Sequence, residues 1–320
     1  MLASDIAREA AEAFHGIFGR KAGGPPSTRH FAGDHGPVWQ ALADGGWLDM
    51  GRPEADGGAG LALRDLVVVA EAWGRHLVPL PYLQTMLVHR WAGANIAPLA
   101  GARLTVGLCQ AGAQGDALAP FLGELGVRYV TALQPLASEA FDAMVAAAPA
   151  ASGAHAARDP ARNERGKSRS DHAPSLPLGT APTGTAGLAS SHRAELAILC
   201  AAELVGCCQA LLEQCIAYAR ERQQFGQPIA DYQAIQHRVA NMHRDLEVSR
   251  TAVLWGANEP EAALRAARVV WDRMRAVTEN AFQIHGGYGY TWDAGVHFYS
   301  RHVWAMGRVL ERCGMALWPN

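Results

Sequence analysis

Residues 220–237, RERQQFGQPIADYQAIQH, separate two helical patterns and decide how the carboxy-terminal part of the chain folds. The apolar helical spacing before this stretch ends near Arg222, and a new helix is expected to begin around Tyr232. Phe225-Gly226 and Pro228 end the first helix, because glycine permits a turn and proline does not continue a helix. The stretch is therefore predicted to be a turn between two antiparallel helices.

The same turn carries side chains that suit a ligand. Arg222 supplies a fixed positive charge, Gln224 an amide and Phe225 an aromatic face, all at one helix end. A guanidinium binds phosphate through a planar fork of donors, so this set favours a planar molecule that bears phosphate. The alternative is an ordinary interhelical turn that binds nothing.

Four apolar stripes at helical spacing follow the start of the last segment, residues 192–320. In chain order they are Ala201, Leu204, Val205, Cys208, Leu211, Leu212, Cys215 and Ile216; Ile235, Val239, Met242 and Leu246; Ala267, Val270, Met274, Val277, Ala281 and Ile284; and Val296, Tyr299, Val303, Met306 and Leu310. Four long amphipathic helices joined by short breaks predict an antiparallel four-helix bundle.

The last break in this pattern is QIHGGYGYTWD, Gln283 to Asp293. It sets Gln283 at a helix end, followed by Gly286, Gly287 and a third glycine, which let a ligand approach the backbone closely. It is not a dinucleotide-binding fingerprint, because no strand precedes it. A generic glycine turn is the alternative interpretation.

The rest of the chain divides into three segments by composition. Residues 1–103 contain short helical patterns interrupted by a Gly/Pro-rich stretch and are predicted to form a helical amino-terminal domain. Residues 104–149 hold two strand-like pieces, LTVGLC and VRYVTAL, and are predicted to form a reduced middle β domain. Residues 150–191 are rich in Ala, Ser, Gly, Pro and charge, which predicts a flexible linker.

Composition excludes several classes of function. A formal net charge of −2 offers no basic field for nucleic acid, which is not expected as a partner. No apolar run is expected to reach the roughly 20 residues of a membrane span, and the amino terminus lacks a signal-peptide core. The six cysteines show no metal-binding spacing and indicate small buried residues in a reducing compartment. We therefore expect a cytoplasmic protein without a bound metal.

The two motifs, taken together and in this order on a helical bundle, resemble those of the acyl-CoA dehydrogenase family. The family pattern RxxFGxPIxxxQAIQH is matched from Arg222 to His237, and QIHGGxGYT is matched from Gln283 to Thr291. The stretch ALADGGWLDMGRPEADGGAGL near the amino terminus is similar to the family's helical entry domain. The resemblance covers about residues 30 to 90 and 195 to 305.

This resemblance implies a mainly α protein. It further implies a helical amino-terminal domain, a middle β domain, a carboxy-terminal four-helix bundle, and FAD held between subunits. Family members place the matching Arg, Phe, Gln and second Gly against the FAD of a neighbouring subunit. Carried over, the predicted cofactor-binding residues are Arg222, Phe225, Gln283 and Gly287, with Gln224 and Gly286 beside them.

The chemistry of such a site requires a carboxylate near the acyl α-carbon, and four carboxylates are candidates. One subset of the family carries its Glu at the position of Leu310, so the neighbouring Glu311 is the first candidate. Another subset carries it at the position of Leu196, beside Glu195. The other two candidates are Glu203 and Asp293. The alternative for all four is a solvated or helix-capping role.

Two departures from the family pattern separate the functional hypotheses. Ala197 stands where many members carry a substrate-contacting Arg, and residues 104–149 lack the family's Thr/Ser-rich flavin-contacting segments. The first hypothesis is an FAD-dependent dehydrogenase of an acyl-CoA thioester, acting as a homo-oligomer or heteromer. The alternative is a non-catalytic subunit that completes the FAD site of a paralogous acyl-CoA dehydrogenase. A helical scaffold without flavin is the third.

Overall fold

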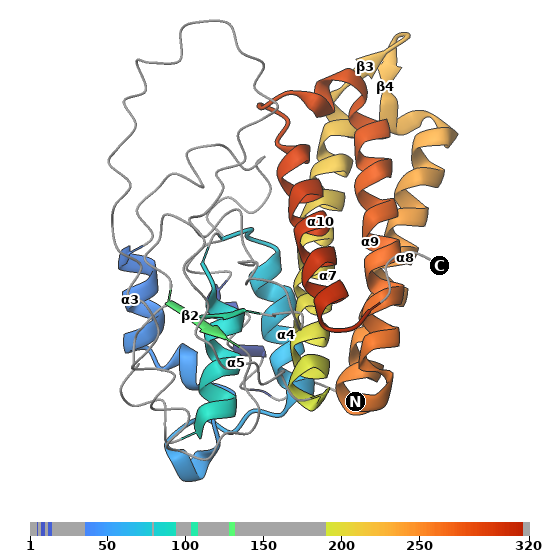
Figure 1. Ribbon diagram of the computed structural model, residues 1–320. Helices are drawn as coiled ribbons and strands as arrows, with labels where there is room; N and C mark the ends of the chain where they lie inside the picture. The colour runs from blue at the N-terminus through green and yellow to red at the C-terminus, as the bar shows by residue number, and fades with distance from the viewer. Residues whose placement is uncertain are drawn as a thin grey trace, which may run out of the picture.

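The computed structural model describes residues 36–78, 80–93, 104–107, 128–131 and 190–315, with Asp5, Arg8, Glu9 and Glu12–Phe14. Four long helices form the carboxy-terminal part: α7 (Ser190–Glu221), α8 (Gln233–Asn258), α9 (Ala263–His285) and α10 (Val296–Arg312). They run alternately up and down beside one another (Figure 1). The predicted antiparallel four-helix bundle is confirmed.

Helix α7 is the centre of the bundle, because it packs against α8, α9 and α10 on one side and α4 on the other. An 18-residue window in it has a mean hydropathy of 1.8, so its length and composition would suit a membrane span. The expectation that no apolar run of this kind exists was therefore wrong. However, 83% of that window is buried inside the protein, as is typical of a core helix.

The described amino-terminal part is helical, as predicted. It comprises α3 (Gly36–Asp44), the 3-10 turns η2 (Trp47–Asp49) and η3 (Glu54–Asp56), and the helices α4 (Leu63–Gly74) and α5 (Tyr82–Ala92). Helix α4 crosses α7 at two glycines, Gly74 of α4 and Gly206 of α7, and each lies against the backbone of the other helix. A Cβ atom on Gly206 would lie 1.8 Å from the Glu71 carbonyl oxygen, and one on Gly74 would lie 2.0 Å from that of Glu203. Only glycine permits this approach of the two helices.

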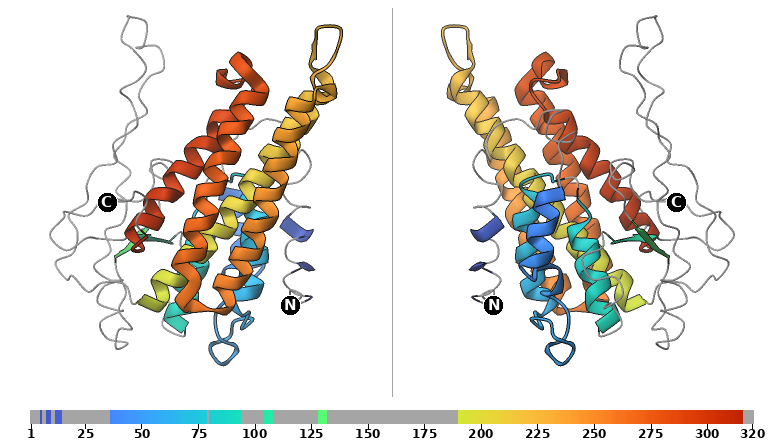
Figure 2. Two further views of the ribbon diagram at one scale, coloured as in Figure 1. Left: turned by 90° about the vertical axis from the view of Figure 1, so that its right-hand side faces the viewer. Right: turned by 90° about the vertical axis from the view of Figure 1, so that its left-hand side faces the viewer.

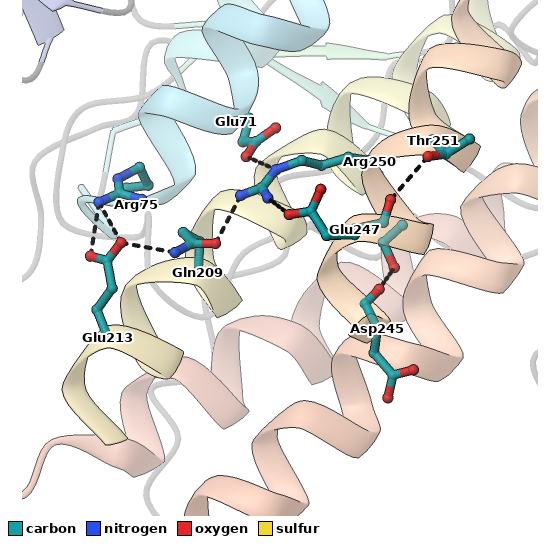
Figure 3. A network of polar contacts seen from close by, with 9 residues as sticks. Glu71, Arg75, Gln209, Glu213, Asp245, Glu247, Arg250 and Thr251 are labelled. Carbon is teal, nitrogen blue, oxygen red and sulfur yellow. Dashed lines mark hydrogen bonds and ion pairs between the residues drawn. The ribbon is translucent and has the colours of Figure 1, made fainter. Parts of the chain in front are cut away.

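A network of charges also fastens α4 to the bundle (Figure 3). Arg250 of α8 donates hydrogen bonds to Glu71 of α4 at 2.7 Å and to Gln209 of α7 at 2.8 Å, and it also pairs with Glu247. Directly after the end of α4, Arg75 donates hydrogen bonds to both carboxylate oxygens of Glu213 of α7. These contacts complement the close helix crossing and fix the amino-terminal helices on the bundle.

Two short strands are described between the two helical parts. β1 (Leu104–Gly107) pairs in parallel with β2 (Arg128–Thr131), with Leu104 opposite Arg128. Both lie within the stretches predicted to be strands. The remainder of the predicted middle β domain, and the predicted linker up to residue 189, lie outside the described residues. Helix α7 begins at Ser190, so the last two residues of the predicted linker are already helical.

Candidate functional site

The first motif forms a β-hairpin that projects beyond the end of α7 (Figure 1). Its strands are β3 (Gln223–Gln224) and β4 (Gln227–Pro228), joined by Phe225 and Gly226 with positive φ angles of 51° and 88°. Two central residues with positive φ make the turn type that suits a tight hairpin. The predicted interhelical turn is thus a hairpin, whose strands are too short to give an alternating pattern in the sequence.

Two contacts hold the hairpin to the helices that flank it. The Ile229 amide donates a hydrogen bond to the Arg222 carbonyl at 2.8 Å, which closes the base of the loop. The Tyr232 hydroxyl donates to the Gln224 carbonyl at 2.9 Å. Sequence reasoning did not identify Tyr232 as a support of this site. The signal was its position at the start of α8, where its side chain can reach back over the hairpin.

Phe225 at the hairpin tip is the most exposed large apolar side chain among the described residues, at 96%. A left-handed backbone conformation costs a residue other than glycine on the order of 1–2 kcal/mol. An aromatic side chain that is both strained and exposed gains nothing from its own fold. It is therefore positioned to pack against another molecule.

The second motif lies at the end of α9, where the chain turns through the 3-10 helix η8 (Gly286–Tyr290). The side chain of Gln283 is exposed one turn before this point. A Cβ atom added to Gly286 or to Gly287 would meet nothing within 4 Å. The backbone at Gly286 and Gly287 therefore faces open space.

The structure brings both motifs to the same end of the bundle, as the views in Figure 2 show. All six predicted cofactor-binding residues, which are Arg222, Gln224, Phe225, Gln283, Gly286 and Gly287, are exposed there. None of the ion pairs between described residues involves Arg222, so its charge is available to an anion. We refer to the hairpin and the glycine turn together as the clamp.

Tyr218 of α7 packs against the glycine turn, and sequence reasoning missed it. Its ring stacks on that of His285 with centroids 4.4 Å apart and on that of Tyr288 at 5.5 Å. The available signal was its spacing, because residue 218 stands one helical turn before Arg222. Burial lowers the pKa of His285 below its usual value. Its Nδ1–H donates to the Ala281 carbonyl at 2.9 Å.

The candidate carboxylates lie elsewhere, and two of them are paired with arginine. Glu311, at the end of α10, is 25% exposed and binds Arg308 at 2.8 Å, while Leu310 beside it is completely buried. Glu195, near the start of α7, accepts a 2.7 Å hydrogen bond from the Trp91 indole and lies 3.3 Å from the Arg90 guanidinium. Glu195 thus links α7 to α5.

The other two carboxylates differ from these in their surroundings. Glu203, halfway along α7, faces His302 of α10 at 3.2 Å, and both side chains are mostly buried. Asp293 is exposed in the segment that follows the glycine turn. Of the four, only Asp293 is near the clamp. The structure does not bring Glu311 and Glu195 together with the six predicted cofactor-binding residues.

The length of α7 separates the clamp from the two arginine-paired carboxylates. Residues 195 and 222 stand at opposite ends of this helix. At a rise of about 1.5 Å per residue, they are about 40 Å apart. Glu311 lies at the end of α10 that is far from the glycine turn. The clamp and these two carboxylates therefore lie at different ends of the bundle.

The described cysteines are structural. All five, Cys200, Cys207, Cys208, Cys215 and Cys313, are buried and unpaired. Burial raises the pKa of the Cys200 and Cys207 thiols well above the usual value. It raises the pKa of Cys313 to about 12, so these three thiols stay protonated. Within the described ranges, no group of three His, Cys, Asp or Glu side chains could hold a metal ion.

Comparison with known proteins places both helical parts in one family. Residues 24–101 match the family model described as the acyl-CoA dehydrogenase N-terminal domain, and residues 189–307 match the one described as the C-terminal domain. The chain is 30% identical over 281 residues to acyl-CoA dehydrogenase IpdE2 of Mycolicibacterium smegmatis, covering 85% of the chain and 83% of that protein. IpdE2 of Mycobacterium tuberculosis is 29% identical over 306 residues, covering 91% and 89%.

Solved structures share the fold. The ChsE4-ChsE5 complex of Mycobacterium tuberculosis aligns with a TM-score of 0.69 and 19% identity, covering 98% of this chain and 95% of the matched chain. Butyryl-CoA dehydrogenase of Megasphaera elsdenii aligns with a TM-score of 0.64 and 17% identity, covering 98% of each chain. At these identities the likeness establishes the fold alone.

Proposed function

This chain belongs to the acyl-CoA dehydrogenase family, and from this we propose that it is a subunit of an FAD-dependent enzyme that dehydrogenates an acyl-CoA thioester between its α and β carbons. The proposal gives the clamp a ligand, the flavin. The observation that carries it is the gathering of six exposed motif residues at one end of the bundle, with open space above Gly286 and Gly287.

We further propose that the clamp binds a flavin held mainly by another subunit. The separation of about 40 Å along α7 supports this, because the clamp cannot serve a reaction centre at Glu195 in its own chain. One solved structure bears on the partner. The ChsE4-ChsE5 structure is a complex of two named chains, and its fold matches this one. The partner is then a second copy or a paralogous acyl-CoA dehydrogenase.

The residues of the clamp have separate tasks in this proposal. The Arg222 guanidinium donates charge-assisted hydrogen bonds to an anionic group, and the Gln283 amide adds a neutral donor and acceptor. Phe225 covers the ligand and excludes water from it. When bound, FAD supplies the acceptor for the hydride that leaves the β-carbon.

The α-proton requires a base, and Glu311 remains the candidate for this role in the present chain. Its ionised carboxylate would accept the proton while hydrogen bonds to the thioester carbonyl acidify the α-carbon. Glu311→Gln should abolish turnover while leaving the flavin bound. Normal turnover in this variant would remove Glu311 from the mechanism.

The alternative is a non-catalytic subunit that contributes only the clamp. Two observations favour it: Leu310 is buried where one subset of the family carries its base, and Glu195 is tied to Arg90 and Trp91. In this case the base belongs to the paralogous subunit, and Glu311→Gln has no effect on turnover. The two candidates share the same clamp and differ in which chain accepts the proton.

Visible absorption of the purified chain distinguishes the two candidates. It should be recorded for the chain alone and after co-expression with an acyl-CoA dehydrogenase-like subunit, before and after acyl-CoA addition. A flavin band from the chain alone that bleaches with acyl-CoA identifies a self-sufficient enzyme. A chain that becomes yellow only with its partner identifies the clamp-donating subunit. Absence of a flavin in both preparations would refute the proposed function.

A further inference from the structure

We propose that Tyr218 is a positioning residue that couples the hairpin and the glycine turn into one rigid flavin-binding unit. This inference rests on the proposed function of the clamp and extends it to a residue outside both motifs. Tyr218 lies on α7 and contacts the glycine turn through two rings, those of His285 and Tyr288. No other described aromatic side chain links the end of α7 to this turn.

The first step concerns the hairpin side. The Arg222 amide donates a hydrogen bond to the Tyr218 carbonyl at 2.8 Å, so the helical backbone continues unbroken from Tyr218 to the first clamp residue. The closure of the loop by the amide of Ile229 then fixes the hairpin on the same end of the helix. A displacement of Tyr218 is therefore transmitted to Arg222.

The second step concerns the turn side. The rings of Tyr218, His285 and Tyr288 are nearly parallel, with interplanar angles of 19° and 10° from Tyr218 to its two neighbours. His285 is the last residue of α9, and Tyr288 lies within η8, so the ring of Tyr218 contacts residues on both sides of Gly286 and Gly287. It thereby restrains the open backbone that faces the ligand.

A third contact from the same face of α7 supports this arrangement. Gln214, one turn before Tyr218, is buried, and its side-chain amide donates to the Ala294 carbonyl just beyond the glycine turn. Residues 214, 218 and 222 are four positions apart and share one helical face. Gln214 and Tyr218 on this face contact the region of the glycine turn, and Arg222 follows them at the end of the helix.

Besides the ring of Tyr218, the described side-chain contacts from this end of α7 to the turn region are those of Gln214 with the Ala294 carbonyl and of Cys215 Sγ with His285 Nδ1. The hairpin and η8 project separately from the bundle (Figure 2). When a flavin contacts both halves, its binding free energy is reduced by the entropy lost in ordering them, unless they are already fixed relative to each other. The ring of Tyr218 supplies that fixation before the ligand binds.

The test compares dissociation constants for FAD. The assembly that binds flavin is first stripped of its flavin, and FAD is then titrated back. We expect Tyr218→Leu to weaken FAD binding roughly three- to tenfold, the size of an aromatic pair contribution. Tyr218→Phe should bind FAD as the wild type does, because it keeps the ring. Trp304→Leu is the matched control, since it removes a half-exposed ring that packs on Trp271 of the bundle away from the clamp.

A double-mutant cycle separates coupling from general destabilisation. Arg222→Ala and Gln283→Ala should interact non-additively in the wild-type background and become additive in Tyr218→Leu, because the two halves then move independently. If Tyr218→Leu does not fold, Tyr288→Leu replaces it in the cycle, since Tyr288 is 43% exposed. A loss of rigidity elsewhere in the bundle does not produce this change in additivity.

The outcomes are distinguishable. Weaker binding in Arg222→Ala combined with unchanged binding in Tyr218→Leu, or with coupling that persists in that variant, overturns this inference alone. Unchanged binding in Arg222→Ala overturns the proposed function, and the inference with it. Equal losses of affinity in Tyr218→Leu and Trp304→Leu also overturn the positioning role.

Discussion

Gly287 lies where the backbone of the glycine turn faces open space. A substitution at this one residue tests whether a ligand approaches that backbone. A Cβ atom there meets no atom of the chain within 4 Å, and the residue does not adopt a positive φ angle. Gly287→Ala should therefore leave the melting temperature unchanged within about 2 °C, because its only cost is a small change in local propensity.

The same substitution should weaken FAD retention in the assembled complex by about tenfold or more, because the added methyl group occupies the space that the ligand requires. The measurement is the ratio of flavin absorbance to protein absorbance after gel filtration. Unchanged flavin content in Gly287→Ala would show that no ligand approaches this backbone.

His285 gives the bundle a dependence on pH whose sign follows from its burial. Burial lowers the pKa of this imidazole below its usual value of 6.5, so the folded state holds it neutral at a pH where the unfolded chain binds a proton. Stability is therefore lost as the pH falls from about 6.5 toward the folded pKa and is constant above that window. Burial lowers the pKa of His89 and His297 in the same direction.

We accordingly expect a lower melting temperature at pH 5.5 than at pH 7.5. His285→Phe keeps a ring against Tyr218 but cannot titrate, so the difference between the two pH values should shrink in this variant. It should not vanish, because His89 and His297 still contribute. An identical pH difference in wild type and variant would exclude His285 as a source of the effect.

At the scale of the elements, the crossing of α4 and α7 requires glycine. The clash of a larger residue there is expected to outweigh the gain in helix propensity. Replacing a glycine inside a helix by alanine ordinarily stabilises it by about 1 kcal/mol. At Gly206 the added methyl group would lie 1.8 Å from the Glu71 carbonyl oxygen. Gly206→Ala should instead destabilise the protein by roughly 1–3 kcal/mol, because the two helices must separate.

The control for this variant lies in the same helix. Ala217 is exposed on α7, so Ala217→Gly measures the propensity contribution without a change in packing. Urea unfolding followed by circular dichroism gives both free energies. A stability of Gly206→Ala equal to or above that of the wild type would contradict the described crossing of α4 and α7.

The four long helices could be predicted from the sequence, whereas the β3–β4 hairpin could not. The four apolar stripes specify α7 to α10 because long amphipathic helices repeat one pattern over several turns. The β3–β4 hairpin carries no such repeat, since each strand has two residues. Its signal lay in Phe225 and Gly226, whose positive φ angles are set by the tight connection rather than by either side chain alone.

The site was predictable in its motif residues and not in its supports. Arg222, Phe225, Gln283 and Gly287 stand in recognisable stretches, and the fold exposes them at one end of the bundle. Tyr218 was missed because its role requires the three-dimensional contact with His285, 67 positions along the chain. The pairing of Glu195 with Arg90 and Trp91 of α5 was equally hidden, because it joins two distant parts of the sequence.

At the scale of the whole molecule, the chain exposes the clamp beyond one end of α7 and holds Glu195 near the other end. Helix α7 spans the distance between them, so in the proposed function two chains together bring a clamp and a reaction centre to the same flavin. This geometry explains why Phe225 and Arg222 remain exposed in the single chain. In the proposed function, assembly with a second subunit is therefore a condition of flavin binding.

The most direct test of this central claim is the flavin content of the purified assembly formed with wild-type chain and with Arg222→Ala. Loss of a charge-assisted contact should weaken FAD binding by roughly ten- to a hundredfold, so the variant assembly should keep its size on gel filtration and lose its yellow colour. Wild-type flavin content in an intact Arg222→Ala assembly would contradict the claim that this end of the bundle binds the cofactor.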